Sequence, residues 1–495
     1  MKFLLIQPPI EDFYITDIRT YPLGLLYIGT FLQKNGHEVM ILDCLNPLRK
    51  KTIPLPEKLS YLKNIYSEKE VGPIKLFGAY YRFGLSDEQI LTKISDFFPD
   101  IIGISCNFTA YFQTAYALIE RIKISFPEIK IVVGGYHATV FKDILEKKYP
   151  AIDQVISGAE EKSFLQALNL PLKKSLCFNE LIPDRSLLAS ELYKIHRQNF
   201  TFITATRGCP RHCSFCTVHS LHGKNYVTRK INSIIKEMTD CYKKHNIRVF
   251  DFEDDNLSYD IDWFESLLDE IAKIFPHKDI RLYAMNGISI ENLTENIMKK
   301  MWQAGFKNLN ISLVSESDQQ KKQMHRPFFN KHFEEVVKIA NKIGFDIITY
   351  FILGLPGQNM EDVEKTINYL SRFEVLLAPS IFYPPPGTSL IKELDKDYNL
   401  PENWVFCRSS VFPVETDTLK RTDLVNYFLL IRLLNFKRHM KKKYQLKNIN
   451  LQELKNLSGA DLDNLNLSSA TEEEIGIAQM KRWAETGEIK RIFNK

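Results

Sequence analysis

The sequence of 495 residues contains no apolar run near the roughly 18 residues needed to cross a membrane. Its first apolar stretch ends at Pro8 and Pro9, too early for a signal peptide. Glycine is scarce, with 21 residues, which excludes a collagen-like or low-complexity chain. The net charge is only +5, which argues against a dedicated nucleic-acid-binding protein. We therefore expect a cytoplasmic protein of two to four domains, with no nucleic acid partner and no transmembrane segment.

Cysteine is also scarce, and the 8 cysteines do not form the pattern of a disulfide framework. Three of them, Cys209, Cys213 and Cys216, follow an apolar strand predicted over 200–205 with the spacing C-x3-C-x2-C. Three thiolates from one short loop can bind three irons of a 4Fe–4S cluster and leave the fourth iron open for a substrate. The spacing therefore predicts an iron–sulfur site.

Zinc is the alternative for this loop. His212, His219 or His222 lies near enough in the sequence to complete a Cys3His site. Structural zinc sites usually take their ligands from two separated pairs rather than from one eight-residue loop. We therefore favour the iron–sulfur interpretation.

The N-terminal third alternates short apolar runs with segments of helical periodicity. This order predicts a parallel sheet with helices on both faces, which binds ligands at the carboxyl ends of its strands. The predicted strands are 3–7, 38–43, 101–105, 130–135 and 154–157. Gly134 and Gly135 would let a large ligand approach the backbone, although they could equally serve a tight turn. Residues 46–95 form a long insertion that could act as a lid.

The cysteine spacing, with an aromatic residue before the third cysteine, resembles the radical S-adenosylmethionine (SAM) superfamily. The N-terminal third resembles the cobalamin-binding domain that precedes the barrel in one subgroup. The residues that carry this second resemblance are Pro22–Leu25, Gly36–Val39, Pro99–Ser105, Val132–Thr139 and Gly158–Glu161. The resemblance covers roughly residues 1–395.

The resemblance implies an α/β architecture in four parts. A flavodoxin-like or Rossmann-like cobalamin-binding domain would span 1–165, with a linker over 166–195. A partial (β/α)6 radical SAM barrel would span 196–400, followed by a mainly helical C-terminal region over 401–495.

The resemblance also implies that the open iron is chelated by the amino and carboxylate groups of SAM. The residues that match the SAM-binding positions of the family are Phe215, Glu253, Asp254, Asp255, Asn286, Ser312, Ser315, Glu316 and Gly354. The acidic turn 253–255 could instead cap a helix, because acidic side chains favour helix starts.

For cobalamin, the matching residues are Pro8, Ser105, Thr109, Gly134, Gly135, His137, Thr139, Gly158 and Glu160. Carrier domains of cobalamin mutases bind cobalt through Asp-x-His-x-x-Gly, but the corresponding segment here, 43–47, has no histidine. The resemblance therefore implies base-off cobalamin without a histidine ligand from the protein. His137 could contact the corrin or its nucleotide tail, or it could be a turn residue.

The implied activity is that of a cobalamin-dependent radical SAM enzyme. The cluster would reductively cleave SAM to a 5′-deoxyadenosyl radical, and methylcobalamin would methylate an unactivated carbon. Three alternatives stay open: a non-methylating cyclase or oxidoreductase of the anaerobic tetrapyrrole cyclase type, a methylthiotransferase with a second cluster on Cys44, Cys106 and Cys177, and a cobalamin-binding sensor or carrier with an inert barrel. The substrate, whether small molecule, lipid or peptide, is not identified. A low-potential electron donor such as flavodoxin or ferredoxin is implied.

The last hundred residues lie outside the resemblance. Periodicity predicts a helix over 424–440, and seven Lys and Arg residues but no acidic residue occur between 424 and 452. This basic segment could be a solvated helix face, or it could meet an anionic substrate or a membrane surface. A helical C-terminal region could also close the mouth of the barrel and keep water from a radical.

Overall fold

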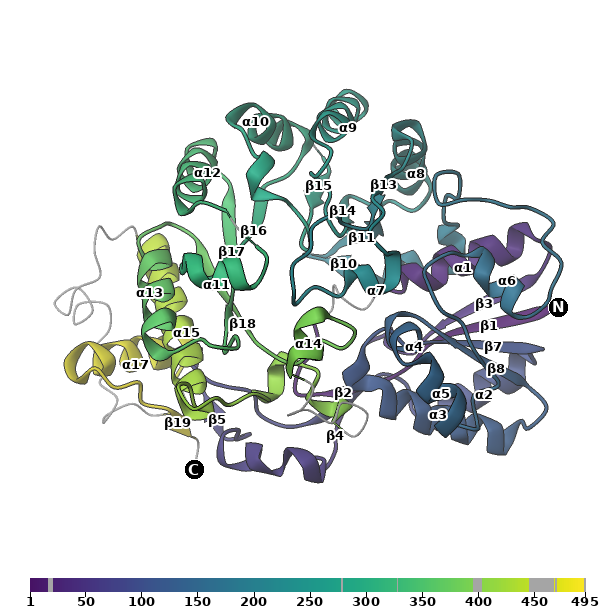
Figure 1. The fold of residues 1–495 in the computed structure, drawn as a ribbon, viewed down its shortest axis with the longest axis horizontal. Coiled ribbons are helices and arrows are strands. Elements are labelled where there is room, and N and C mark those ends of the chain that lie inside the picture. The colour runs from purple at the N-terminus through teal and green to yellow at the C-terminus, as the bar shows by residue number, and fades with distance from the viewer. Residues whose placement is uncertain are drawn as a thin grey trace.

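The computed structural model describes residues 1–16, 21–276, 279–326, 328–394, 403–444, 467 and 470–493. Two α/β units lie side by side, and the C-terminal helices lie at the end of the molecule away from the N-terminal sheet (Figure 1). The first unit is called the N-terminal domain below, and the second is called the barrel.

The N-terminal domain is built on a five-stranded parallel sheet in the order β3-β1-β7-β8-β9. The strands are β1 (Lys2–Gln7), β3 (Glu38–Asp43), β7 (Ile101–Ser105), β8 (Lys130–Gly134) and β9 (Gln154–Val155). The five strands predicted from the sequence are confirmed. The strand order reverses between β1 and β7, and ligands of open α/β sheets bind at such a reversal.

Alternating side chains of the sheet enter two separate cores. Phe3 and Leu5 pack with α1 (Leu23–Lys34) and α6 (Lys162–Ala167) on one face. Leu4 and Ile6 pack with α2 (Asp87–Phe97) and α3 (Phe112–Ser125) on the other. This is the two-residue period of a strand that is buried on both faces.

The barrel has six parallel strands with helices outside them (Figure 1). The strands are β11 (Gln198–Ile203), β14 (Val249–Phe252), β15 (Arg281–Tyr283), β16 (Asn308–Val314), β17 (Asp346–Leu353) and β18 (Leu376–Ile381). The outer helices are α8 (Ile231–Lys244), α9 (Ile261–Ile274), α10 (Glu295–Ala304), α12 (Asn330–Ile343) and α13 (Met360–Ser371). The six strands pair in two sheets, β11-β14-β15 and β16-β17-β18. In the described residues β11 does not pair with β18, so the barrel is open there, as the resemblance implies.

The insertion packs against the barrel rather than standing free as a lid. Its strands β4 (Lys50–Thr52) and β6 (Tyr81–Phe83) form a small antiparallel sheet with β2 (Ile10–Asp12). The insertion also contains a short 3-10 helix, η2 (Glu57–Asn64). Apolar side chains of the insertion, Leu59, Leu62, Tyr66, Ile74 and Leu76 among them, share one core with the barrel and the C-terminal helix. From their position in the sequence alone, these side chains would be assigned to the core of the N-terminal domain.

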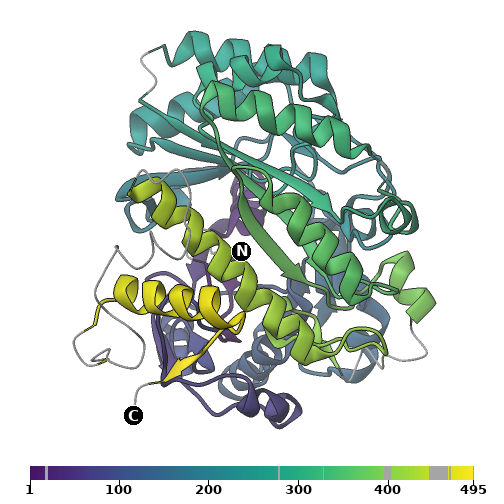
Figure 2. The same ribbon diagram turned by 90° about the vertical axis from the view of Figure 1, so that its left-hand side faces the viewer.

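The C-terminal helix α15 (Arg421–Lys443) covers the exposed edge of β18. Asn435 donates to the Leu377 carbonyl at 2.7 Å and accepts from the Leu377 amide at 3.0 Å, which satisfies backbone groups of an edge strand. Helix α17 (Glu472–Thr486) packs beside α15 (Figure 2). The chain then ends in β19 (Ile492–Phe493), which pairs with β5 (Glu70–Val71) of the insertion.

The structure gives the basic residues of α15 intramolecular partners. Lys441 pairs with Glu374 at 3.3 Å and Lys442 with Asp346 at 3.1 Å. Arg438 donates to carbonyls at the end of α13, including that of Leu370 at 3.2 Å. These basic residues are therefore paired within the chain. The predicted basic segment also includes Lys447, which lies outside the described residues.

A short segment before α15 joins the C-terminal region to the N-terminal domain. The Trp404 ring is buried against the rings of Phe112 and His137, at centroid distances of 5.1 and 4.6 Å. Nearby, the buried Arg408 lies 3.4 Å from Asp12 and donates to the Tyr80 hydroxyl at 3.1 Å. The C-terminal region therefore contacts both units.

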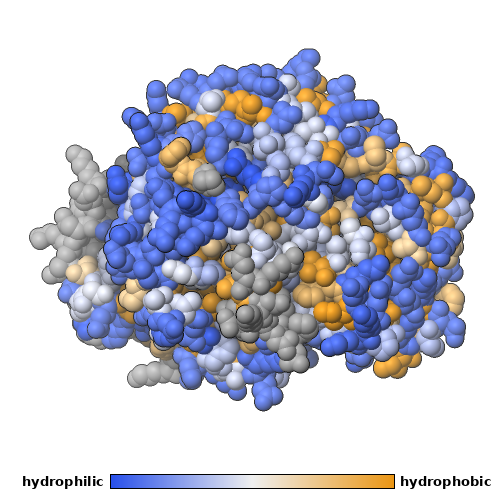
Figure 3. Space-filling view, in the orientation of Figure 1, coloured by the Kyte–Doolittle hydropathy of each residue, from blue (hydrophilic) through white to orange (hydrophobic). Residues whose placement is uncertain are grey.

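No helix among the described residues is both long and apolar enough to span a membrane. On the face shown in Figure 3, apolar residues form separate patches among polar ones.

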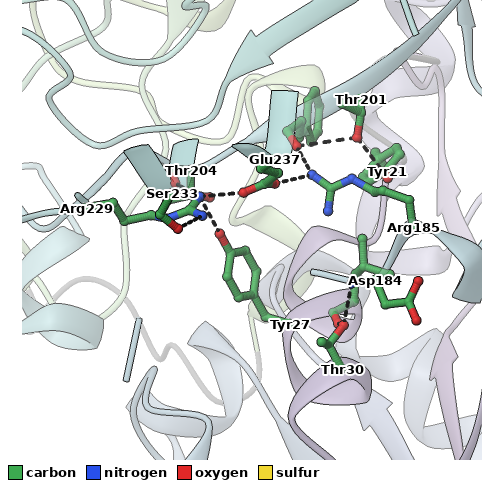
Figure 4. A network of polar contacts seen from close by, with 12 residues as sticks. Tyr21, Tyr27, Thr30, Asp184, Arg185, Thr201, Thr204, Arg229, Ser233 and Glu237 are labelled. Carbon is green, nitrogen blue, oxygen red and sulfur yellow. Dashed lines mark hydrogen bonds and ion pairs between the residues drawn. The ribbon is translucent and has the colours of Figure 1, made fainter. Parts of the chain in front are cut away.

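A buried ion-pair network joins the two units (Figure 4). Glu237 of α8 lies 2.7 Å from Arg185 of the linker and 2.7 Å from Arg229 of the barrel. All three side chains are at most 2% exposed. Arg229 also donates to the Tyr27 hydroxyl of α1 at 3.3 Å, and Arg185 donates to the Phe202 carbonyl of β11 at 2.7 Å. One carboxylate thus compensates two buried cations that touch both units.

Removing this carboxylate should therefore be costly. The substitution Glu237→Gln is expected to lower the free energy of unfolding by about 3 kcal/mol, because it leaves two buried guanidinium groups uncompensated. Lys236→Gln, on the exposed side of the same helix, is the matched control and should change it by less than about 0.5 kcal/mol. Urea unfolding followed by circular dichroism measures both, and a loss below about 1 kcal/mol for Glu237→Gln would contradict this account.

Candidate functional site

The cysteine loop, residues 206–217, starts at the carboxyl end of β11 and is fixed there by Asp254. The Asp254 carboxylate accepts from the Ala205 amide at 3.0 Å, from the Thr206 hydroxyl at 2.7 Å and from the Thr206 amide. Burial raises the pKa of Asp254 to about 7, although these three donors act to lower it. Asp254 lies beneath the loop and sets the direction in which the loop leaves the strand.

The neighbouring carboxylate, that of Asp255, fixes the loop at Gly208. It accepts from the Gly208 amide at 2.9 Å. Gly208 has φ = +83°, and a Cβ added there would lie 1.9 Å from the Asn225 carbonyl oxygen. Only glycine fits this approach, so the residue before Cys209 is determined by the fold.

Two hydrogen-bond donors face the sulfurs of the loop. Asn256 donates to Cys209 Sγ at 3.5 Å, and Arg326 lies with its guanidinium 3.8 Å from Cys213 Sγ. Both donors favour an anionic sulfur. Burial, together with the nearby thiols of Cys213 and Cys209, raises the pKa of Cys216 to about 11. That direction is expected of thiols placed together before a metal takes up their charge.

Sequence reasoning missed Asn256 and Arg326. Asn256 directly follows the acidic turn 253–255. Its position beside the loop could therefore have been expected from the sequence. Arg326 lies 110 residues after the third cysteine, and no local pattern signals its approach.

The residues that the resemblance assigns to SAM divide into two groups. Glu253 and Asn286 are hydrogen-bonded to each other at the carboxyl ends of β14 and β15, on the side of the cysteine loop. Phe215 lies inside the loop and packs against apolar residues from β16 and from the segments after β17 and β18. With Asp254 and Asp255, these residues lie together around the loop.

The second group lies farther out. The chain bulges between Ser312 and Val314, and Val314 has φ = +68°. After this bulge, Ser315 is fully buried, with its hydroxyl 3.5 Å from Thr366 of α13, and Glu316 accepts from Asn330 of α12. Gly354 donates its amide to Gln358 at 2.7 Å. Ser312 itself is half-buried on β16. The structure thus turns Ser315 and Glu316 toward the outer helices.

The N-terminal domain has a narrow cavity of about 210 Å³ between its sheet and α1. Its walls include Gly24, Gly134, Gly135, Gly158 and Glu160. A Cβ added at Gly24 or Gly158 would meet nothing within 4 Å, and one at Gly134 would meet nothing closer than 3.8 Å. Gly24, Gly134 and Gly158 therefore border open space. Gly135 instead makes a close approach in a turn, because it has φ = +109° and a Cβ added there would lie 2.4 Å from Asn107 Oδ1.

A wider cavity of about 350 Å³ lies at the same edge of the sheet and shares Ser105 and Asn107 with the narrow one. Pro8, Tyr14 and Phe108 are among its walls, which are mainly apolar and carry no charged side chain among the described residues. The two cavities together run along the carboxyl ends of β1, β7 and β8.

Three residues predicted to contact cobalamin do not line either cavity. His137 is fully buried and stacks on Phe112, with Nδ1 3.2 Å from the Thr109 hydroxyl. Burial lowers the pKa of His137 to about 3, so its ring is neutral. A ligand could reach it only by displacing Phe112 or Trp404. Thr139 accepts from the Gly158 amide at 3.0 Å and so supports the cavity wall from behind.

One ion pair links the narrow cavity to the cysteine loop. Arg207, two residues before Cys209, donates to Glu161 at 2.6 Å and to the Ala159 carbonyl at 3.3 Å. Arg207 and Glu161 both line the narrow cavity, as does His222 from the helix after the cysteine loop. The two candidate sites are therefore adjacent in space.

The other cysteines lie apart from the cysteine loop in the sequence. The described residues contain no group of three His, Cys, Asp or Glu side chains close enough together for one metal ion, at the cysteine loop or elsewhere. Cys44 and Cys106 are buried at strand ends, whereas Cys177 is exposed in the linker.

The donor sets fit the cofactors that the sequence suggests. Three thiols on one loop, with an amide and a guanidinium directed at their sulfurs, suit three irons of a cluster. The glycine-walled cavity at the reversal of strand order suits an extended ligand that reaches into the domain.

Comparison with known proteins agrees with this geometry. Residues 203–370 match the radical SAM superfamily, and residues 78–168 match the B12 binding domain. Cytidylyl-2-hydroxyethylphosphonate methyltransferase of Streptomyces wedmorensis is 24% identical to this chain, in a match that covers 79% of this chain and 81% of that protein. The ribosomal protein uS12 methylthiotransferase RimO of Caldanaerobacter subterraneus is 32% identical, but the match covers only 35% of this chain and 42% of the relative.

Among solved structures, the radical S-adenosylmethionine methyltransferase TsrM from Kitasatospora setae, with cobalamin and a 4Fe–4S cluster bound, has the same fold. Its TM-score is 0.58 at 15% identity, and the match covers 80% of this chain and 74% of TsrM. The methylthiotransferase match is limited to a part of the chain, whereas the methyltransferase matches extend over both units. The chain therefore carries a B12 binding domain over residues 78–168, followed by a radical SAM domain over residues 203–370.

Proposed function

We propose that the protein is a cobalamin-dependent radical SAM methyltransferase that acts on an unactivated carbon. The observation that carries this proposal is the adjacency of the two sites, because Arg207 reaches from the cysteine loop into the wall of the narrow cavity. Radical formation and methyl donation must take place on one substrate, so the two cofactors have to lie close together. A binding module would need neither the cysteine loop nor this adjacency.

In this proposal Cys209, Cys213 and Cys216 hold three irons of a 4Fe–4S cluster, and the fourth iron is left to SAM. Asn256 and Arg326 stabilise the anionic sulfurs. Glu253 and Asn286 face the amino group of SAM, and Phe215 contributes an apolar surface beside it. When bound, the cluster, SAM and cobalamin supply one-electron reduction and methyl transfer, while the protein orients them and excludes water.

For cobalamin, the walls of the narrow cavity would hold one part of the ligand, and Pro8, Ser105 and Gly135 at the carboxyl edge of the sheet would contact the rest. Asp43 at this edge is held by the Tyr193 hydroxyl at 2.7 Å and by Gln7 at 3.0 Å. It therefore has a structural role in a segment that lacks the histidine of cobalamin mutases. Cobalamin would bind base-off, with no histidine ligand from the protein.

The proposal also places the protein in the cytoplasm, where a low-potential donor such as flavodoxin or ferredoxin would supply its electrons. The eight cysteines are all free, as a reducing compartment requires. An iron–sulfur enzyme of this kind needs an external source of electrons. The substrate is left as a small molecule, lipid or peptide.

The direct test of the proposed function is product analysis. Protein reconstituted anaerobically with iron, sulfide and hydroxocobalamin is given SAM, a reductant and a pool of small molecules. Comparable amounts of S-adenosylhomocysteine and 5′-deoxyadenosine are expected, because each turnover uses one SAM as methyl donor and one as radical source. 5′-Deoxyadenosine alone would contradict methylation and favour the cyclase alternative. Neither product, with hydroxocobalamin bound, would favour a sensor or carrier.

Loss of one thiol should abolish cluster chemistry. Cys213→Ala is expected to reduce SAM cleavage to the reductant-only background and to lower the iron content from about four per chain. Cys177→Ala, at an exposed linker position, is the control and should keep both values. Iron loss in the control variant would instead indicate a second cluster of the methylthiotransferase type.

Filling the narrow cavity should block cobalamin without unfolding the domain. Gly24 lies in helix α1, where a larger residue has better helix propensity and its Cβ meets nothing within 4 Å. Gly24→Leu should weaken hydroxocobalamin binding at least tenfold, whereas Gly24→Ala, which adds one carbon, should have a much smaller effect. Equilibrium titration by absorbance, with a thermal melt of each variant, measures this. Unchanged affinity in Gly24→Leu would place the ligand elsewhere.

A further inference from the structure

The ion pair between Arg207 and Glu161 has features that distinguish it from an ordinary surface pair. The side chain of Glu161 is 6% exposed and that of Arg207 is 19% exposed, at a separation of 2.6 Å. The guanidinium lies 4.0 Å from the ring centroid of Phe178 in the linker and 5.1 Å from that of Tyr27 in α1. Such stacking fixes the plane of the guanidinium and shields the pair from solvent, so the contact is both directional and strong.

The backbone on both sides of Arg207 is rigid. Thr206 is held by Asp254, and Gly208 donates to Asp255 at 2.9 Å in a conformation that only glycine can adopt. Arg207 itself pairs with Val227 in a two-stranded ribbon. No flexible hinge separates Arg207 from Cys209. A displacement of the Arg207 side chain is therefore transmitted along the cysteine loop to Cys209.

The other end of the pair belongs to the cavity wall. Gly158, Ala159, Glu160 and Glu161 follow β9 and line the narrow cavity, and Arg207 is hydrogen-bonded to two of these four residues. A ligand that fills the cavity would contact this segment directly. It would thereby restrict the position of the groups that hold the guanidinium.

From these contacts we propose that Arg207 and Glu161 couple the two cofactor sites, so that cobalamin in the narrow cavity tightens SAM binding at the cysteine loop and SAM tightens cobalamin binding. This inference rests on the proposed function. Arg207 acts here as a positioning residue, because it reaches the reacting groups only through the cysteine loop. Linkage requires the effect to be reciprocal, with the same factor in both directions.

The test is a binding cycle on cluster-reconstituted protein. The dissociation constant of SAM is measured with and without saturating hydroxocobalamin, and that of hydroxocobalamin with and without saturating SAM. In the wild-type protein each ligand should tighten the other about tenfold, within the usual range of coupling between sites. In Arg207→Met and Glu161→Gln, this ratio should fall to within twofold of one, although each ligand alone still binds. Arg207→Lys, which keeps the charge but not the paired contacts, should give an intermediate ratio.

Lys162→Gln is the matched control, because Lys162 adjoins Glu161 but forms an exposed ion pair with Glu160 and is not hydrogen-bonded to Arg207. It should keep the wild-type ratio. A ratio of one in the wild-type protein, or a wild-type ratio in Glu161→Gln, would overturn the coupling. A general loss of stability would weaken both ligands and leave their ratio unchanged, which would also overturn it. Failure of the wild-type protein to bind hydroxocobalamin at all would instead refute the proposed function.

Discussion

The arrangement of the two units depends on one buried carboxylate. Glu237 lies between Arg185 and Arg229, and through them it touches the linker, the first strand of the barrel and helix α1 of the N-terminal domain. A buried carboxylate between two arginines tolerates little displacement, because separating any member leaves a charge without compensation in a region of low dielectric. The carboxyl edge of one sheet is thereby fixed beside the carboxyl edge of the other.

The cysteine loop depends on the same kind of interaction. In 206–217 the only strand residues are Thr206 and Arg207, so the loop is positioned by side-chain acceptors rather than by a ladder of backbone hydrogen bonds. Asp254 and Asp255 hold it from the barrel, and Glu161 holds it from the N-terminal domain through Arg207. The acidic turn after β14 thus has two uses. Two of its carboxylates shape the loop, while Glu253 is left beside the space that we assign to SAM.

Much of the fold could be predicted from the sequence, because parallel strands buried on both faces are continuous apolar runs. All five strands of the first sheet and all six of the barrel lie where those runs occur. The cysteine motif was equally visible, since its ligands are local. What could not be predicted depends on distant segments. The insertion packs into the barrel core, Arg326 approaches Cys213, and Trp404 covers His137, and none of these contacts has a periodic signal. The burial of His137 could not be predicted for the same reason, because a histidine after a glycine turn gives no indication that an aromatic ring from a remote segment will cover it.

The central claim is that a cluster at the cysteine loop and cobalamin at the glycine-walled cavity lie next to each other in one active site. Electron paramagnetic resonance of protein that carries both the reduced cluster and cob(II)alamin measures this most directly, because neighbouring paramagnets broaden and split each other's signals. The account predicts such mutual broadening in the doubly loaded protein and its disappearance in Gly24→Leu, at a cobalamin concentration that saturates the wild-type protein but leaves this variant largely unloaded. Two unperturbed signals from protein that holds both cofactors would contradict it.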